Sequence, residues 1–335
     1  MGAIREYIIP RLIVYFLVIY VGVTLAFFIP RIAGVDPVMV MMNRIAAYAE
    51  FMDPESVEQL LDTMRELYGL KGSLWEQYVK FLQRIVVGDF GVSLTSFPTP
   101  VSDIIWRALP WTIGLLSIST LISWIIGNIA GAVAAYYSEK PWSRILSGFA
   151  VVIYPIPYYL MSLTLLFIFG FLIPLFPLRG ATTIGREISL NLQTLLDIAY
   201  HSILPALSLV ITSFGWWFIS MKNIAFHEKL ADYTQFAELI GLPKRFILNK
   251  FVIRNSLLPQ ITGLSVSLAG IFNGALMTEL VFSYPGIGYI LYQSILNGDF
   301  NLMMGIVIYS IISVSTATLI IDLIYPLIDP RIRYR

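Results

Sequence analysis

Long apolar runs recur along this chain, and each is long enough to cross a lipid bilayer. A membrane-spanning helix needs about 20 mostly apolar residues, and six runs meet this requirement. They cover residues 8–29, 112–137, 146–172, 200–221, 257–282 and 302–328. Only 13% of the residues are charged, whereas soluble domains are about one quarter charged. The sequence therefore predicts an all-α polytopic membrane protein with six transmembrane helices.

The distribution of Lys and Arg predicts the orientation, because short cytoplasmic connections are enriched in both. One set of connections contains Arg5, Arg11, Lys140, Arg144, six basic residues between 222 and 254, and Arg331, Arg333 and Arg335. The short connections of the opposite set have only Arg179 and Arg186, and the long segment from Pro30 to Pro110 is excluded from this count because the rule applies to short connections. We therefore expect the first set, and with it both termini, to be cytoplasmic. No small-residue cleavage site follows the first run, which predicts an uncleaved helix rather than a signal peptide.

Residues 31–110 form a large connection that this orientation makes external. Asp53-Pro54 is typical of a capped helix start, and Gly69 of the end of that helix. Ser73 with Glu76 predicts a capping box for a second helix, which Gly88 ends and whose apolar face includes Trp75 and Val86. The sequence thus divides into an N-terminal helix (1–30), an external helical region (31–110) and a five-helix core (111–335).

Glycine and proline positions give weaker expectations about the spans. The Gly-xxx-Gly pairs at 127/131 and 270/274 allow close helix packing. Pro155 and Pro157 in the third span and Pro205 in the fourth predict kinks. Such kinks are as consistent with simple curvature as with a hinge.

The sequence lacks the residue patterns of several kinds of active site. It has no phosphate-binding loop of the G-x-x-x-x-G-K-[S/T] type and no cysteine. Its two histidines, His201 and His227, are predicted to lie on opposite sides of the membrane, so no metal site, cofactor site or catalytic set is expected. The net charge of +1 gives no electrostatic basis for a nucleic-acid partner.

Few ionisable residues fall inside the predicted spans, and none is central. Glu279 and Asp322 lie near span ends, whereas ion-coupled carriers keep such groups at mid-membrane. A self-sufficient secondary carrier and a membrane-embedded enzyme therefore remain as the less favoured alternatives. The candidate substrate-pathway residues are Tyr158, Ser213, Asn273, Thr278 and Glu279.

The basic loop between the fourth and fifth spans is the predicted point at which energy enters. Its apolar helical stretch stops at Gly241, and Leu242-Pro243 turns the chain. Ala237 and Gly241 lie one helical turn apart and are expected to leave a small-residue face open to a partner. A plain interfacial amphipathic helix is the alternative interpretation.

Several stretches resemble the dipeptide/oligopeptide class of ABC importer permeases. Tyr233–Arg245 with Arg254–Pro259 is similar to the coupling motif of that family. The other similar stretches are Asp36-Pro37-Val38, Gly88–Leu94, Glu279–Gly288 followed by Asn297-Gly-Asp299, and Asp322–Arg333. Their order indicates the first of two permeases, the one with the large external loop. Gln235 and Phe236 depart from the Glu-Ala pattern of the general motif, so no ion pair is expected at Gln235.

The resemblance implies a type I ABC importer permease fold and a set of partners. These are a second homologous permease, two ATPases that bind ATP and Mg, an external solute-binding protein and the lipid of the plasma membrane. This chain is then not an enzyme. The implied ATPase-coupling residues, on a helix at about 232–245, are Tyr233, Thr234, Ala237, Glu238, Gly241, Leu242, Lys244 and Arg245. The implied binding-protein contacts are Asp89, Phe90 and Ser93.

The resemblance leaves the substrate open. Peptides are favoured, since the class is named for them. Oligosaccharides such as cellobiose-like glycans are the first alternative, and nickel is the second.

Overall fold

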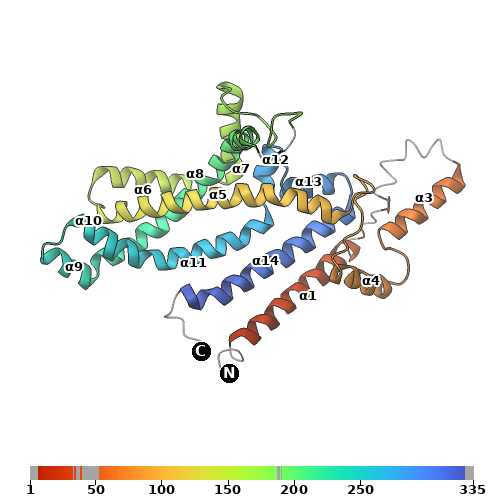
Figure 1. Cartoon of the computed structure of the whole chain (residues 1–335), viewed down its shortest axis with the longest axis horizontal. Coiled ribbons are helices and arrows are strands. Elements are labelled where there is room, and N and C mark those ends of the chain that lie inside the picture. Colours follow the sequence, from red (N-terminus) through yellow and green to blue (C-terminus); the bar gives the residue numbers. More distant parts are fainter. Residues whose placement is uncertain are drawn as a thin grey trace. The chain divides into compact units, whose positions relative to one another are not determined.

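The computed structural model describes residues 7–32, 34, 38–39, 53–186, 189 and 191–328. These residues are helices and connecting turns, apart from an isolated bridge between Val92 and Pro100 (Figure 1). The chain divides into two compact units. Among the described residues, the first comprises those up to Pro110 and Gly286–Ile320, and the second comprises those of Trp111–Pro285 and 321–328.

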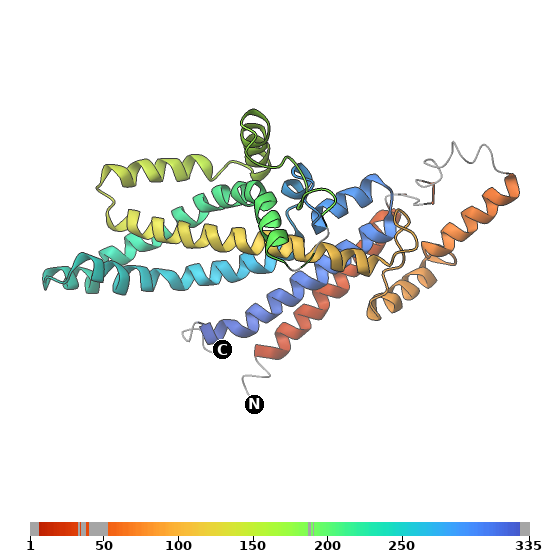
Figure 2. The same ribbon diagram turned by 45° about the horizontal axis from the view of Figure 1, so that its top comes forward.

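The first unit contains two long apolar helices, α1 (Ile9–Ile32) and α14 (Phe300–Ile328), which run side by side (Figures 1 and 2). The hydroxyls of Tyr15 and Thr316 lie 3.0 Å apart and join the two helices. The unit also contains α3 (Pro54–Leu67), α4 (Leu74–Val86), the start of α5 (Val101–Tyr136) and α13 (Ile287–Leu296).

Both predicted helix starts between the first two spans are confirmed. The Asp53 carboxylate accepts a hydrogen bond from the Ser56 amide at 3.0 Å, and Pro54 is the first helical residue of α3. In α4, Ser73 accepts from the Glu76 amide at 3.3 Å while the Glu76 carboxylate accepts from the Ser73 amide at 2.9 Å. These caps satisfy backbone donors that have no partner within the helix.

α4 packs across the end of α1 through two aromatic residues, Tyr78 and Phe81, whose rings both lie close to the ring of Phe27. Tyr78 is only 4% exposed, and its ring lies 5.2 and 5.3 Å from the rings of Phe27 and Phe28. Tyr78 was not among the residues predicted for the apolar face of α4, and Trp75 and Val86, which were, are 69% and 85% exposed. Part of the predicted apolar face of α4 is therefore exposed and is not buried within the chain.

The second unit is built around the longest helix, α8 (Leu192–Leu230). Its other elements are α5 from Trp111, α6 (Pro141–Ile153), α7 (Tyr158–Leu166) with η2 (Phe167–Leu172), α9 (Asp232–Leu239), α10 (Lys244–Ile247) with η3 (Leu248–Ile253), α11 (Arg254–Gly270), η4 (Ile271–Asn273) and α12 (Leu276–Val281).

Four helices of the described chain are long and apolar enough to cross a membrane: α1, α5, α8 and α14. Four of the six predicted runs fall on them. The predicted third span is instead a pair, α6 and Tyr158–Leu172, bent by 100°. Pro155 and Pro157 lie in the break, and this break is much sharper than the predicted kink. The predicted fifth span is divided into α11, η4 and α12, because Gly274 at φ +75° interrupts the helix.

The two Gly-xxx-Gly pairs behave differently. A Cβ atom on Gly127 would lie 2.5 Å from Trp217 Cβ, and one on Gly131 would lie 2.6 Å from the Phe218 carbonyl oxygen, so α5 packs closely on α8. A Cβ atom on Gly270 would meet no atom within 4 Å. The described chain therefore makes no close helix contact at Gly270, and close packing at the second pair stays a prediction.

Some predicted features lie outside the described residues. These are Asp36-Pro37, the tail from 329 to 335, and the first six residues with Arg5.

Candidate functional site

The loop after α8 folds as a short helix with a defined stop. Ala231 is extended (φ −65°, ψ 142°) and separates α8 from α9. At the other end the Gly241 amide donates to the Glu238 carbonyl at 3.0 Å, and the Leu242 amide donates to the Ala237 carbonyl at 3.2 Å. Gly241 has φ +79°, a conformation that favours glycine. The predicted helix stop at Gly241 is confirmed.

The inner face of α9 is buried in the same chain. Thr234 and Ala237 are 0% and 2% exposed. Ala237 belongs to a core cluster that includes Tyr136 of α5, Met221 of α8 and Val252 of η3. The predicted small-residue face at Ala237 is therefore not open to a partner, because the small side chain lets α9 approach its own core.

Polar contacts fix α9 to three other helices. The Tyr136 hydroxyl donates to Glu238 Oε1 at 2.9 Å, which joins α9 to α5. The Tyr233 hydroxyl donates to the Glu228 carboxylate of α8 and accepts from Asn255 Nδ2 of α11 at 3.0 Å. A displacement of α9 therefore acts directly on three helices of the second unit.

The outer face of α9 is apolar and exposed. Phe236, Leu239 and Ile240 are 63%, 85% and 58% exposed, and Lys244 and Arg245 beside them are exposed as well. We call Phe236, Leu239 and Ile240 the outer apolar face. Sequence reasoning missed it, although apolar residues at positions i, i+3 and i+4 of a loop helix were a visible signal.

Two of the candidate pathway residues are fully buried. Glu279 is 0% exposed, and its Oε1 accepts a hydrogen bond from the Thr112 hydroxyl at 2.8 Å. Thr278 is also 0% exposed and lies 3.4 Å from Ser162 Oγ, which donates to Ser208 Oγ at 2.9 Å. In this structure these side chains hold α12 against α5, α7 and α8, so neither lines an open path.

The other pathway candidates are less enclosed. Tyr158, at the start of α7, is 41% exposed, and Ser213 in α8 is half-buried. The side chain of Asn273 lies outside the described part of the structure. The four candidates whose side chains are described thus do not form one exposed surface.

The loop after α4 separates the three residues expected to meet a binding protein. Asp89 is exposed and forms an ion pair with Arg84 at 2.9 Å. The hydrogen bond from Arg84 holds the pKa of Asp89 below its usual range, so the pair is intact at neutral pH. Phe90 is half-buried, whereas Ser93 is 0% exposed. The expectation that Ser93 contacts a partner is wrong in this structure, because Ser93 donates to the buried Asp299 carboxylate at 2.5 Å.

Asp299 anchors that loop to α14. Its Oδ2 also accepts from the Thr95 amide at 3.1 Å and the Thr95 hydroxyl at 2.7 Å. Its Oδ1 accepts from the Leu302 amide at 3.1 Å, which caps the start of α14. The stretches 88–94 and 297–299, far apart in the sequence, therefore form a single local structure.

We expect Asp299→Ala to loosen this structure, since four donors lose a charged acceptor. The expected loss of unfolding free energy is about 2–4 kcal/mol, with faster hydrogen–deuterium exchange at the amides of residues 93–96. Asp89→Ala is the matched control, because it removes an exposed ion pair and should cost at most about 1 kcal/mol. Equal exchange rates in both variants would contradict the anchoring role.

Among the described residues, no group of three or more His, Asp and Glu side chains could hold a metal ion.

Comparison with known proteins gives consistent results. Residues 127–334 match the family model described as binding-protein-dependent transport system inner membrane component. The chain is 30% identical to the oligopeptide transport system permease protein AppB of Bacillus subtilis, over 94% of this chain and 96% of AppB. It is 26% identical to the dipeptide transport system permease protein DppB of Lactococcus lactis and 24% identical to the glutathione transport system permease protein GsiC of Escherichia coli. Each of these two matches covers 98% of this chain and 99% of the relative.

Proposed function

Since this chain belongs to the family of binding-protein-dependent transport system inner membrane components, we propose that it forms the pathway by which an ATP-driven importer moves short peptides. It is a polytopic inner-membrane transport subunit and not an enzyme. Full-length similarity to AppB is the observation that carries the peptide assignment. The three relatives are named for oligopeptide, dipeptide and glutathione transport, which favours peptides over oligosaccharides and nickel.

We further propose that the chain crosses the membrane six times. The crossings are α1, α5, the bent pair α6 and α7–η2, α8, the interrupted segment α11–η4–α12, and α14. Interrupted helices are tolerated in a bilayer where other protein elements surround the break. The buried contacts of Thr278 and Glu279 give α12 such surroundings. In this topology both termini are cytoplasmic, and α3 and α4 are external.

The outer apolar face of α9 is the proposed docking surface for one of two partner ATPases, which bind ATP and Mg. Its three exposed apolar side chains are flanked by Lys244 and Arg245, which suits a hydrophobic contact with a polar rim. Tyr233, Glu238 and the buried Ala237 then carry movement of α9 into α5, α8 and α11. A second permease completes the pathway, and an external solute-binding protein meets the surface near Asp89 and Phe90.

The substrate assignment predicts which solute stimulates ATP hydrolysis. In vesicles that contain the assembled importer and its binding protein, we expect peptides of two to five residues to stimulate hydrolysis, and cellobiose and nickel to leave the basal rate unchanged. Stimulation by cellobiose but not by peptides would mean that the substrate is an oligosaccharide and not a peptide. Uptake driven by an ion gradient in vesicles with this chain alone would instead support a secondary carrier.

A further inference from the structure

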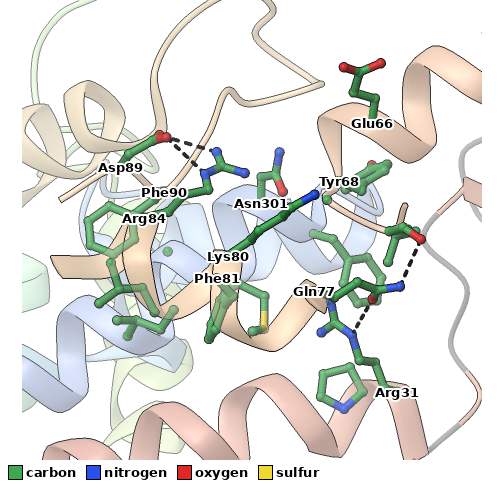
Figure 3. Close-up of a pocket in the computed structure, with 18 of the residues that line it drawn as sticks. Arg31, Glu66, Tyr68, Gln77, Lys80, Phe81, Arg84, Asp89, Phe90 and Asn301 are labelled. Carbon is green, nitrogen blue, oxygen red and sulfur yellow. Dashed lines mark hydrogen bonds and ion pairs between the residues drawn. The ribbon is translucent and has the colours of Figure 1, made fainter. Parts of the chain in front are cut away.

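A cavity of about 300 Å³ lies in the first unit, where α3 and α4 meet the ends of α1 and α14 (Figure 3). Arg31 of α1, Lys80 of α4 and Asn301 of α14 all line it. Asp89 and Phe90, near the surface proposed for the binding protein, also line this cavity, whereas Arg31, Lys80 and Asn301 belong to none of the sites described above.

One end of the cavity carries positive charge that the chain only partly neutralises. Lys71 pairs with Asp62 and Glu66, and Arg84 pairs with Asp89. Within the described residues, no carboxylate lies within ion-pair distance of Lys80 or Arg31. Figure 3 shows the Lys80 side chain extending into the cavity toward Tyr68 and Asn301. This end therefore suits an anionic group.

The Arg31 guanidinium is held in place by neutral groups and not by a carboxylate. Its Nη1 donates to the Phe27 carbonyl at 2.9 Å, and its guanidinium lies 3.6 Å from the centre of the Phe27 ring. Its Nε donates to Gln77 Oε1 at 3.5 Å (Figure 3). The positive group is thus oriented by neutral partners, and its charge remains available to a ligand.

The other end of the cavity is mainly apolar, and the charged residues that lie there beside Phe90, Arg84 and Asp89, pair with each other (Figure 3). Phe81 and Ile85 of α4, Phe90 of the following loop, and Met304 and Ile308 of α14 line it. A ligand that fills both ends must join an anionic group to a hydrocarbon part, which is the chemistry of a membrane lipid.

The surroundings of the cavity are also those of a bilayer surface. α4 exposes Trp75 and Val86, and α1 exposes Ile29 and Ile32 at 58% and 82% next to the cavity-lining Pro30 and Arg31. Tryptophan is enriched where protein meets the lipid headgroups, and an amphipathic helix lies with its apolar face in that layer. In the six-crossing topology proposed above, α1 spans the membrane and its last turn lies at the level of the headgroups.

We propose that this cavity binds one anionic phospholipid, with its phosphate near Lys80 and Arg31 and an acyl chain toward Met304 and Ile308. An acidic peptide could use the same positive end, but it would leave the apolar end unfilled. The lipid is therefore the occupant that matches the whole lining. The bound lipid would join α4 to the ends of α1 and α14.

The test is lipid retention by the full-length chain, purified in detergent, mixed with dioleoyl phosphatidylglycerol or dioleoyl phosphatidylcholine, and measured by native mass spectrometry. We expect preferential retention of one phosphatidylglycerol molecule. Lys80→Gln should weaken retention about fivefold, the effect of removing one basic residue from an anionic lipid surface, and Lys80→Arg should restore it. Arg65→Gln is the matched control, since Arg65 is an exposed cation of α3 that does not line the cavity.

Three outcomes would overturn the proposal. These are equal retention by the wild type and Lys80→Gln, displacement of the lipid by sn-glycerol 3-phosphate, and displacement by a glutamate-containing tripeptide at the same concentration. The second would indicate a site for a soluble phosphate, and the third a site for a peptide. Lys80 is exposed, so its substitution should leave the thermal midpoint unchanged. The measurement involves neither transport nor ATP hydrolysis, so its failure and that of the proposed function are distinguishable.

Discussion

Leu239→Asp is expected to leave the chain folded in the membrane and to abolish solute-stimulated ATP hydrolysis by the assembled importer. Leu239 is 85% exposed, so the substitution removes little packing within the chain. In the proposed ATPase contact, the same carboxylate would have to lose its water without gaining a partner, which costs several kcal/mol. ATP hydrolysis with and without loaded binding protein measures the effect directly.

Ile184→Asp is the matched control for this prediction. Ile184 is 89% exposed and lies in the connection before α8, far in sequence from α9. The same apolar-to-acid change there should preserve stimulation. Leu239→Met should preserve it as well, because it keeps an apolar side chain of similar size. Full stimulation in Leu239→Asp would exclude the outer apolar face as the coupling surface.

Because Leu239 is exposed whereas Ala237 is buried, Leu239 is a better position for testing docking than the small residues that the sequence favoured. Ala237→Arg would place a charge in a core where Ala237 is 2% exposed, so lost coupling could reflect local unfolding. Gly241→Trp would strain a backbone at φ +79°. Neither variant separates docking from folding, whereas Leu239→Asp does.

Features set by neighbouring residues could be predicted from the sequence. The caps at Asp53 and Ser73 and the helix stop at Gly241 depend on groups within a few residues of each other, and all three are confirmed. The apolar runs likewise predicted the positions of the long helices, because each run is a continuous stretch of the sequence. Local chemistry therefore located the caps and the long helices, whereas α5 starts, and α8 both starts and ends, several residues beyond the predicted runs.

Features set by distant partners could not be predicted. Ser93 was expected to contact a binding protein, but it is bonded to Asp299, which is 206 positions away. Glu279 was expected to line the pathway, but it is buried and accepts a hydrogen bond from Thr112, which is 167 positions away. A residue type limits which bonds can form, but only the tertiary structure determines which of them do form.

The two Gly-xxx-Gly pairs show the same limit. Gly131 of the first pair packs against another helix, whereas Gly270 of the second pair meets no atom of the described chain within 4 Å.

Gly131→Ala is expected to lower the free energy of unfolding by about 1–3 kcal/mol and to reduce the yield of folded protein. The added carbon would meet the Phe218 carbonyl oxygen at 2.6 Å and the Lys222 amide nitrogen at 3.1 Å. Both are backbone atoms of α8, so relief requires that the helix move.

Gly148→Ala in α6 is the control for the Gly131 substitution, since a carbon added there would meet no atom within 4 Å. Alanine favours a helix over glycine by up to about 1 kcal/mol, so this variant should be at least as stable as the wild type. Thermal unfolding of the two variants in the same detergent is the measurement. If the close approach of α5 and α8 is the cause, Gly131→Ala should lower the stability and Gly148→Ala should not. A loss of stability in both variants would mean that alanine is disfavoured at these glycines for a reason other than helix contact.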